Sequence, residues 1–227
     1  MGLHWICVGA EAAVGVEASY DSKVNADFYE FFLVFCGLGG ASLWLFFNPN
    51  PALTSLISMH IVSTSRLNLR QMTTADAEIM LALVNEPSWL RFIGDRGVHS
   101  LQQARDYIAN GAMANYARLG FGFYMVELSE SGQAIGMCGL TQRDYLDCPD
   151  IGFAFFPEFN GKGYAFEAAA AVLEYAKQTL GLPRILATTR LDNQRSAQLL
   201  EKLGMRLEKV ILPPDSDKEL SLYSIDF

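Results

Sequence analysis

Ile151-Gly-Phe-Ala-Phe-Phe-Pro-Glu-Phe-Asn-Gly-Lys-Gly-Tyr-Ala-Phe-Glu-Ala168 is the stretch of this sequence that decides the fold. Its first six residues are apolar or glycine, which predicts a strand over residues 150–156. After this strand the chain turns at Gly161 and Gly163, and an amphipathic helix is predicted over residues 165–180. A strand therefore runs through a glycine turn directly into a long helix.

The glycine turn has the chemistry of an anion site. Glycines let consecutive backbone N–H groups turn inward, and a helix start adds free N–H donors and the positive end of the helix dipole. The two phosphates of a pyrophosphate suit such a nest, and Lys162 adds a point charge. The alternative is a structural turn whose glycines serve only for positive φ. The spacing excludes a Walker A loop, and the four preceding strands and Phe166 argue against a Rossmann turn.

The segments on either side of this stretch indicate an α+β domain. The other predicted strands cover residues 66–70, 122–128, 134–142, 184–189, 206–211 and 219–226. The other predicted helices cover about residues 75–85, a segment from the capping Ser100 through Ile108, and residues 193–203. Short links between residues 122 and 156 favour antiparallel pairing of neighbouring strands.

Three segments of the chain together resemble the GCN5-related N-acetyltransferase (GNAT) superfamily. Residues 160–165 resemble its acyl-CoA-binding motif, Arg/Gln-x-x-Gly-x-Gly/Ala, although Asn160 stands where the family usually has Arg or Gln. Asn193-Gln-Arg-Ser196, followed by Leu200-Glu-Lys-Leu-Gly204, is similar to the second family signature. Thr64-Ser-Arg-Leu-Asn-Leu-Arg70 is similar to the start of the branch that includes ribosomal-protein alanine acetyltransferases. The resemblance covers residues 62–227 in the right order and spacing.

The resemblance implies an acyl-CoA N-acyltransferase fold of the α+β class, with a mixed, mostly antiparallel seven-stranded sheet and helices on both faces. It implies an enzyme that moves an acetyl group from acetyl-CoA, its co-substrate, to a primary amine without a metal. The acceptor would be a protein amino terminus or a small-molecule amine, and we expect residues 89–99 and 144–149 to decide between them. The alternative is a non-catalytic acyl-CoA-binding module, which would keep the glycine turn but lack a working base.

The resemblance also suggests which residues hold the co-substrate. Backbone groups near two adjacent aromatic residues would pair with pantetheine and the thioester oxygen. The turn would hold the pyrophosphate, and a helix-capping asparagine would touch the cofactor or a bound water. The predicted cofactor-binding residues are Phe155, Phe156, Asn160, Gly161, Lys162, Gly163, Tyr164, Ala165 and Asn193.

Catalysis of acetyl transfer requires a neutral amine, a polarised carbonyl and a stabilised leaving thiolate. Asp150, at the start of a strand, is the predicted base, acting directly or through water. The alternative is that Asp150 is a solvent-exposed carboxylate without a catalytic role. The other candidate carboxylates are Glu158, Asp144 and Asp147. Leu200 sits where many family members have a tyrosine that acts as general acid. Ser196 is therefore the predicted group that steadies the departing thiolate.

The composition and charge of the chain limit the kinds of ligand and partner that we expect. The chain has 227 residues and a formal net charge of −8, and its basic residues are dispersed, so a nucleic-acid partner is not expected. The negative field favours cationic substrates such as amines. The four cysteines have no CxxC spacing and the three histidines no His–Glu–x–x–His pattern, so we expect no metal site. We expect a cytoplasmic enzyme.

The composition of the chain changes near residue 60, from a largely uncharged segment to one that carries charged residues throughout. Residues 31–65 contain no charged residue, and the apolar run 31–47 reaches the lower length limit of a membrane-spanning helix. Its acidic flank suits neither an anchor nor a signal peptide. Three interpretations of residues 1–58 remain: a membrane anchor, a buried extension of the domain, or untranslated sequence upstream of a start at Met59. We favour the last, with residues 59–227 forming the N-acetyltransferase domain.

Overall fold

The computed structural model describes residues 37–38, 41–42, 59–214 and 216–227 of the chain. β1 (Gly37–Leu38) and β2 (Ala41–Ser42) pair with each other in antiparallel fashion. They belong to the unit Met1–Thr54, and every other element belongs to the unit Ser55–Phe227. The rest of the apolar run 31–47 lies outside the described residues. No helix within the described ranges is long and apolar enough to cross a bilayer.

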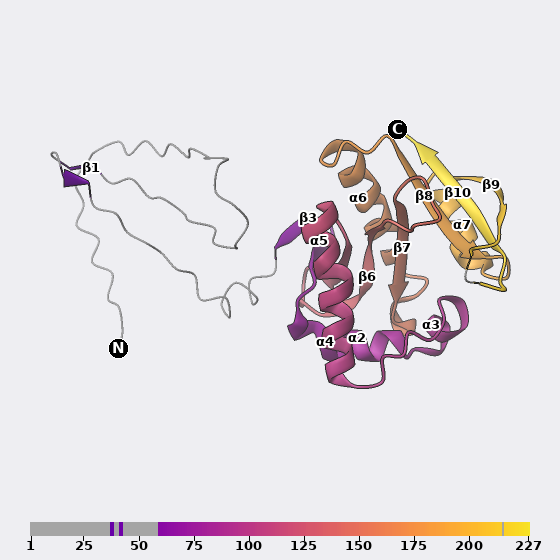
Figure 1. The fold of residues 1–227 in the computed structure, drawn as a ribbon, viewed down its shortest axis with the longest axis horizontal. Helices are drawn as coiled ribbons and strands as arrows, with labels where there is room; N and C mark the ends of the chain where they lie inside the picture. The colour runs from indigo at the N-terminus through magenta and orange to yellow at the C-terminus, as the bar shows by residue number, and fades with distance from the viewer. Residues whose placement is uncertain (1–36, 39–40, 43–58, 215) are drawn as a thin grey trace. The chain divides into compact units, whose positions relative to one another are not determined.

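The second unit is built around one mixed sheet of eight strands, in the order β3-β4-β5-β6-β7-β8-β10-β9 (Figure 1). All neighbours run antiparallel except β7 and β8. The strands are β3 (His60–Ser63), β4 (Leu67–Gln71), β5 (Phe123–Leu128), β6 (Ala134–Thr141), β7 (Asp150–Phe155), β8 (Arg184–Arg190), β9 (Arg206–Ile211) and β10 (Leu220–Asp226).

The seven predicted strands are confirmed, but the predicted number of strands in the sheet was one too low. The eighth strand is β3, which pairs with β4 so that His60 lies opposite Arg70 and Ser63 opposite Asn68. β3 has only four residues, and it continues the uncharged stretch that precedes it. The sequence therefore offered no alternation of polar and apolar residues by which to recognise it.

The helices lie close to their predicted places, with two additions. They are α2 (Ala77–Val84), α3 (Pro87–Phe92), α4 (Leu101–Ile108), α5 (Ala114–Leu119), α6 (Tyr164–Gln178) and α7 (Gln194–Lys202), with 3₁₀ turns η1 (Thr74–Asp76) and η3 (Pro157–Phe159). A π-helical turn, η2 (Ala109–Met113), joins α4 to α5. The predicted caps are present: the Ser100 hydroxyl accepts from the Gln103 amide and the Asn193 side chain from the Ser196 amide.

α3 covers the first part of residues 89–99, the segment expected to help select the acceptor, where we predicted no helix. It begins at a proline, whose fixed φ suits a first helical turn. Its six residues span fewer than two turns, so no helical periodicity was available in the sequence.

The helices cover both faces of the sheet, as predicted (Figure 1). On one face, Ala169, Val172 and Ala176 of α6 are fully buried in a core that also contains Leu200 of α7. On the other face, α2, α3 and α4 bury their apolar residues against the sheet. Side chains alternate between these cores along β7: Phe155 belongs to the α6 core, whereas Ala154 and Phe156 contact the α2–α4 core.

The sheet opens between its two parallel strands. β7 pairs with β6 along its whole length, from Asp150 opposite Thr141 to Phe155 opposite Gly136. Its register with β8, by contrast, consists of Asp150 opposite Leu186 alone, although the structure describes every residue of both strands. β7 and β8 therefore separate beyond Asp150, and β7 leads from that opening toward α6.

Candidate active site

The glycine turn presents free backbone donors at the start of α6. Gly161 and Gly163 have φ values of +76° and +84°, in the left-handed region that favours glycine. Gly163 is the N-cap, and the first intrahelical bond runs from the Glu167 amide to the Gly163 carbonyl (3.0 Å). The amides of Gly163 and of the next three residues therefore have no acceptor inside the helix. This is the geometry that an anion site requires.

Positive charge and aromatic rings flank the turn. The Lys162 ammonium lies 5.5 Å from the centre of the Phe159 ring, and the Arg66 guanidinium lies 4.6 Å from the centre of the Tyr164 ring. Asn160 is exposed, and its amide donates to the Pro157 carbonyl (3.1 Å). The predicted turn residues Asn160, Gly161, Lys162, Gly163, Tyr164 and Ala165 thus form one continuous surface.

Phe155 and Phe156 present their backbones to opposite sides of β7. The Phe156 amide donates to the Ile135 carbonyl (3.0 Å), and so faces β6. Because backbone groups alternate along a strand, the N–H and C=O of Phe155 face the opening between β7 and β8. Of the two predicted aromatic residues, it is Phe155 whose backbone is available to a molecule in that opening.

Asp150 is a buried carboxylate at the closed end of the opening. Its side chain is 1% exposed and its Oδ2 accepts from Arg143 Nε at 2.9 Å. Its Oδ1 is also buried and has no hydrogen-bond partner among the described residues. Burial raises the pKa of Asp150 to about 6, and Arg143 opposes that rise. A carboxylate with this pKa is ionised at neutral pH and can accept a proton.

The three alternative bases have no comparable setting. Glu158, Asp144 and Asp147 are all exposed to solvent. The sequence did not reveal the partner of Asp150, since Arg143 lies seven residues earlier, in the loop between β6 and β7. Arg143 also donates to the Tyr145 hydroxyl (3.3 Å), which links the predicted acceptor loop to the carboxylate.

The distance between the turn and Asp150 suits an extended ligand. They lie at opposite ends of β7, and the strand from Asp150 to Phe155 spans roughly 17 Å at about 3.3 Å per residue. A molecule with its phosphates on the turn and its arm along β7 would bring its far end toward Asp150.

The predicted α7 residues lie on the α6 side of the sheet. The Asn193 Oδ1 accepts from the Ser196 amide at 3.2 Å, so Asn193 caps the helix as expected. Asn193 and Ser196 are both half-buried in the first turn of α7. Leu200 is 2% exposed and packs in the core, and its aliphatic side chain cannot donate a proton.

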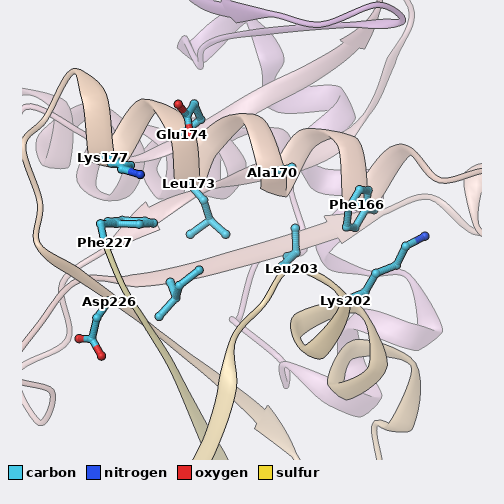
Figure 2. A pocket seen from close by; sticks show the side chains of 10 residues that line it. Phe166, Ala170, Leu173, Glu174, Lys177, Lys202, Leu203, Asp226 and Phe227 are labelled. Atoms are coloured by element: carbon cyan, nitrogen blue, oxygen red, sulfur yellow. The ribbon is translucent and has the colours of Figure 1, made fainter.

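A shallow pocket with an apolar floor and charged residues at its rim lies between α6, the end of α7 and the end of β10 (Figure 2). Leu173 and Leu203 line its middle, and Phe227 lies at one end. At the other end, the Lys202 ammonium lies 4.6 Å from the centre of the Phe166 ring. Phe166 is three residues beyond Gly163, so this end of the pocket adjoins the glycine turn.

No group of three or more His, Cys, Asp or Glu side chains that could hold a metal ion occurs within the described ranges. Of the cysteines in these ranges, Cys138 is a buried free thiol and Cys148 a half-buried one.

Comparison with known proteins agrees with this architecture. The family described as "Acetyltransferase (GNAT) domain" matches residues 66–206. An uncharacterised N-acetyltransferase of Bacillus subtilis, YoaA, is 33% identical over 153 residues, which are 66% of this chain and 85% of the relative. The crystal structure of an acetyltransferase from Agrobacterium tumefaciens is 26% identical, with a TM-score of 0.63, over 76% of this chain and 95% of that one.

A further neighbour has the same fold. It is the ribosomal L7/L12 alpha-N-protein acetyltransferase RimL in complex with coenzyme A, with a TM-score of 0.64 and 17% identity over 74% of this chain and 97% of that one. The chain belongs to the GNAT acetyltransferase family and is an acetyl-CoA-dependent acyltransferase.

Proposed function

We propose that this enzyme transfers the acetyl group of acetyl-CoA to a primary amine, with Asp150 as the base. The observation that carries the proposal is the opening between β7 and β8. It joins a turn of free backbone amides at one end to a buried, ionisable carboxylate at the other.

The proposed reaction uses the glycine turn, the Phe155 amide and Asp150, which follow one another from the turn to the start of β7, together with Ser196 of α7. The turn holds the pyrophosphate of acetyl-CoA, and the Phe155 amide donates to the thioester oxygen as negative charge develops on it. Asp150 first accepts a proton from the protonated amine, directly or through a water molecule, and the neutral nitrogen then attacks the carbonyl carbon. The C–S bond breaks, the Ser196 hydroxyl donates a hydrogen bond to the departing thiolate, and the thiolate takes up the second proton that the nitrogen loses.

The acceptor is proposed to be a protein amino terminus or a small-molecule amine. Support for a protein acceptor comes from the RimL neighbour, whose name describes acetylation of a ribosomal protein. Support for either comes from the net charge of −8, which attracts cationic ligands. The segment expected to select the acceptor includes Trp89, which is buried, and Arg91, whose NH2 lies 3.3 Å from Asp192 in the turn before α7.

Steady-state release of CoA, followed with a thiol-reactive dye, tests the proposal. The panel comprises peptides with free amino termini, free amino acids, polyamines and an aminoglycoside. We expect amine-dependent thiol release, with the acetylated product seen by mass spectrometry as a gain of one acetyl group. CoA binding without transfer to any of these amines would instead favour the non-catalytic acyl-CoA-binding module.

A further inference from the structure

The Glu167 carboxylate in the first turn of α6 is held by the residues that lead into β4. Its Oε1 accepts from the Thr64 hydroxyl (2.5 Å), the Ser65 hydroxyl (3.2 Å) and the Arg66 amide (3.0 Å). Its Oε2 accepts from Arg66 Nε (2.7 Å) and lies 2.6 Å from Arg66 NH2. Although burial alone would raise it, these bonds hold the pKa of Glu167 below its usual value, so the carboxylate stays ionised.

The other side of the Arg66 guanidinium reaches the glycine turn itself. Its NH1 donates to the Lys162 carbonyl at 3.1 Å, and the guanidinium lies over the Tyr164 ring. A Cβ at Gly163 would stand 3.3 Å from Arg66 NH2. Arg66 thus contacts Lys162 and Tyr164 and lies beside the Cβ position of Gly163, while Glu167 binds the opposite edge of the guanidinium.

The bond to the Lys162 carbonyl sets the direction of a neighbouring amide. In a trans peptide, the carbonyl of one residue and the N–H of the next point to opposite sides. No cis peptide occurs in the described part of the chain. With the Lys162 carbonyl turned toward Arg66, the Gly163 N–H points away from Arg66, to the open side of the turn.

We propose that Arg66 is a positioning residue for the donor site: it holds the Lys162 peptide so that the Gly163 amide faces the pyrophosphate, and Glu167 anchors Arg66 in that pose. This inference rests on the proposed use of acetyl-CoA at the glycine turn. Its simpler competitor is that Arg66 only neutralises the charge of Glu167 near the phosphates.

The charge and the geometry can be separated by two variants. Arg66→Gln removes the positive charge and also the guanidinium that bridges the Glu167 carboxylate and the Lys162 carbonyl. The double variant Arg66→Gln/Glu167→Gln restores the original net charge but not the bond to the Lys162 carbonyl. Arg184→Gln is the matched control, because Arg184 is likewise an ion-paired arginine, but its partners, Glu208 and Asp226, lie on β9 and β10.

The measurement compares two donors on the full chain, with the best amine of the panel as acceptor. Acetyl-CoA carries the pyrophosphate, whereas S-acetylpantetheine lacks it. For Arg66→Gln we expect kcat/KM for acetyl-CoA to fall about tenfold or more, the loss typical of a charged hydrogen bond. The value for S-acetylpantetheine should stay within about twofold, because a free amide positioned for phosphate matters only when phosphate is present. The double variant should show the same selective loss, and Arg184→Gln should show none.

Two results would overturn the inference. Recovery of acetyl-CoA use in the double variant would mean that Arg66 acts through charge alone. An equal loss with both donors would mean a general structural role. Calorimetric titration with CoA gives a second readout, in which Arg66→Gln should bind about tenfold more weakly. If the wild-type enzyme transferred acetyl groups from acetyl-CoA to none of the amines in the panel, the proposed function would fail. That failure would be seen in the wild-type enzyme alone, before any variant is compared.

Discussion

At the residue scale, the distinctive feature of the site is a carboxylate that is buried yet ionisable. Burial raises the pKa of Asp150 and Arg143 lowers it, so the two effects leave the value at about 6. This is close to the range in which a general base works best at neutral pH, because it is largely deprotonated and still basic. Glu158, Asp144 and Asp147 are exposed and lack this burial.

Replacing Asp150 by Asn keeps the size of the side chain but removes the proton acceptor. We expect kcat to fall by about 10²-fold or more, the usual contribution of a positioned base, with acetyl-CoA binding unchanged. The loss should shrink as pH rises, because more of the acceptor amine is then already neutral. Glu158→Gln is the matched control, since it removes an exposed carboxylate and should leave kcat unaltered. The reverse pattern, a normal Asp150→Asn enzyme and an inactive Glu158→Gln enzyme, would transfer the role to Glu158.

The dependence of kcat on pH in the wild-type enzyme should reflect the ionisation of Asp150 beside Arg143. A base must be deprotonated, so kcat should decline as pH falls through about 6. Arg143→Gln removes the cation that lowers the pKa of Asp150, and the acid limb should therefore move to higher pH. Profiles of kcat from pH 5 to 9 for both enzymes test this, and a shift of the limb to lower pH in Arg143→Gln would contradict it.

At the scale of elements, a bulge in β6 shapes the strand that borders the opening. The register between β5 and β6 shifts where Val126 faces Gly136 and Glu127 faces Ala134. A Cβ at Gly136 would meet the Ala154 carbonyl oxygen and come within 2.8 Å of Phe155 Cα. The missing side chain therefore allows β6 to approach β7 where the Phe155 backbone turns toward the opening.

Gly136→Ala should lower the free energy of unfolding by about 1–3 kcal/mol, the usual cost of overpacking. It should also weaken acetyl-CoA binding, because the Phe155 backbone would have to move. Gly111→Ala is the control: Gly111 lies in the helical turn η2, with nothing within 4 Å of its Cβ position, so alanine there should be neutral or stabilising. Chemical denaturation of both variants decides the matter, and equal stability of the two would refute this account of the bulge.

The elements that the sequence predicted correctly are those whose signals are local. The length and periodicity of α6, its glycine turn, and the polar caps Ser100 and Asn193 could all be recognised without tertiary contacts. β3, α3 and α5 were missed because elements of four to six residues are too short to show a period. The ion pair that we propose positions the glycine turn was missed for another reason. Arg66 and Glu167 are 101 residues apart, and only the folded chain brings them together.

At the scale of the whole molecule, residues 59–227 contain all the groups assigned to the site. We predict that a chain starting at Met59 folds and binds acetyl-CoA. β3 belongs to this chain, and the Gln71 amide donates to the Met59 carbonyl (2.8 Å), so a start at residue 64 should be less stable. Thermal unfolding and CoA titration of the two shortened chains test the boundary. Aggregation of the chain from Met59, alongside a stable full-length chain, would instead favour residues 1–58 as a buried extension.

The central claim is that the glycine turn before α6 binds the pyrophosphate of acetyl-CoA, and calorimetric titration of two glycine variants tests it most directly. Gly163→Val places a branched side chain beside the amides of the turn. Gly132→Val is the matched control, because Gly132 also has a left-handed φ, +69°, and lies in the turn between β5 and β6. Both variants carry similar backbone strain. With circular dichroism confirming that both are folded, we expect Gly163→Val to lose acetyl-CoA binding and Gly132→Val to retain the wild-type affinity. Unchanged affinity in a folded Gly163→Val chain would contradict the account.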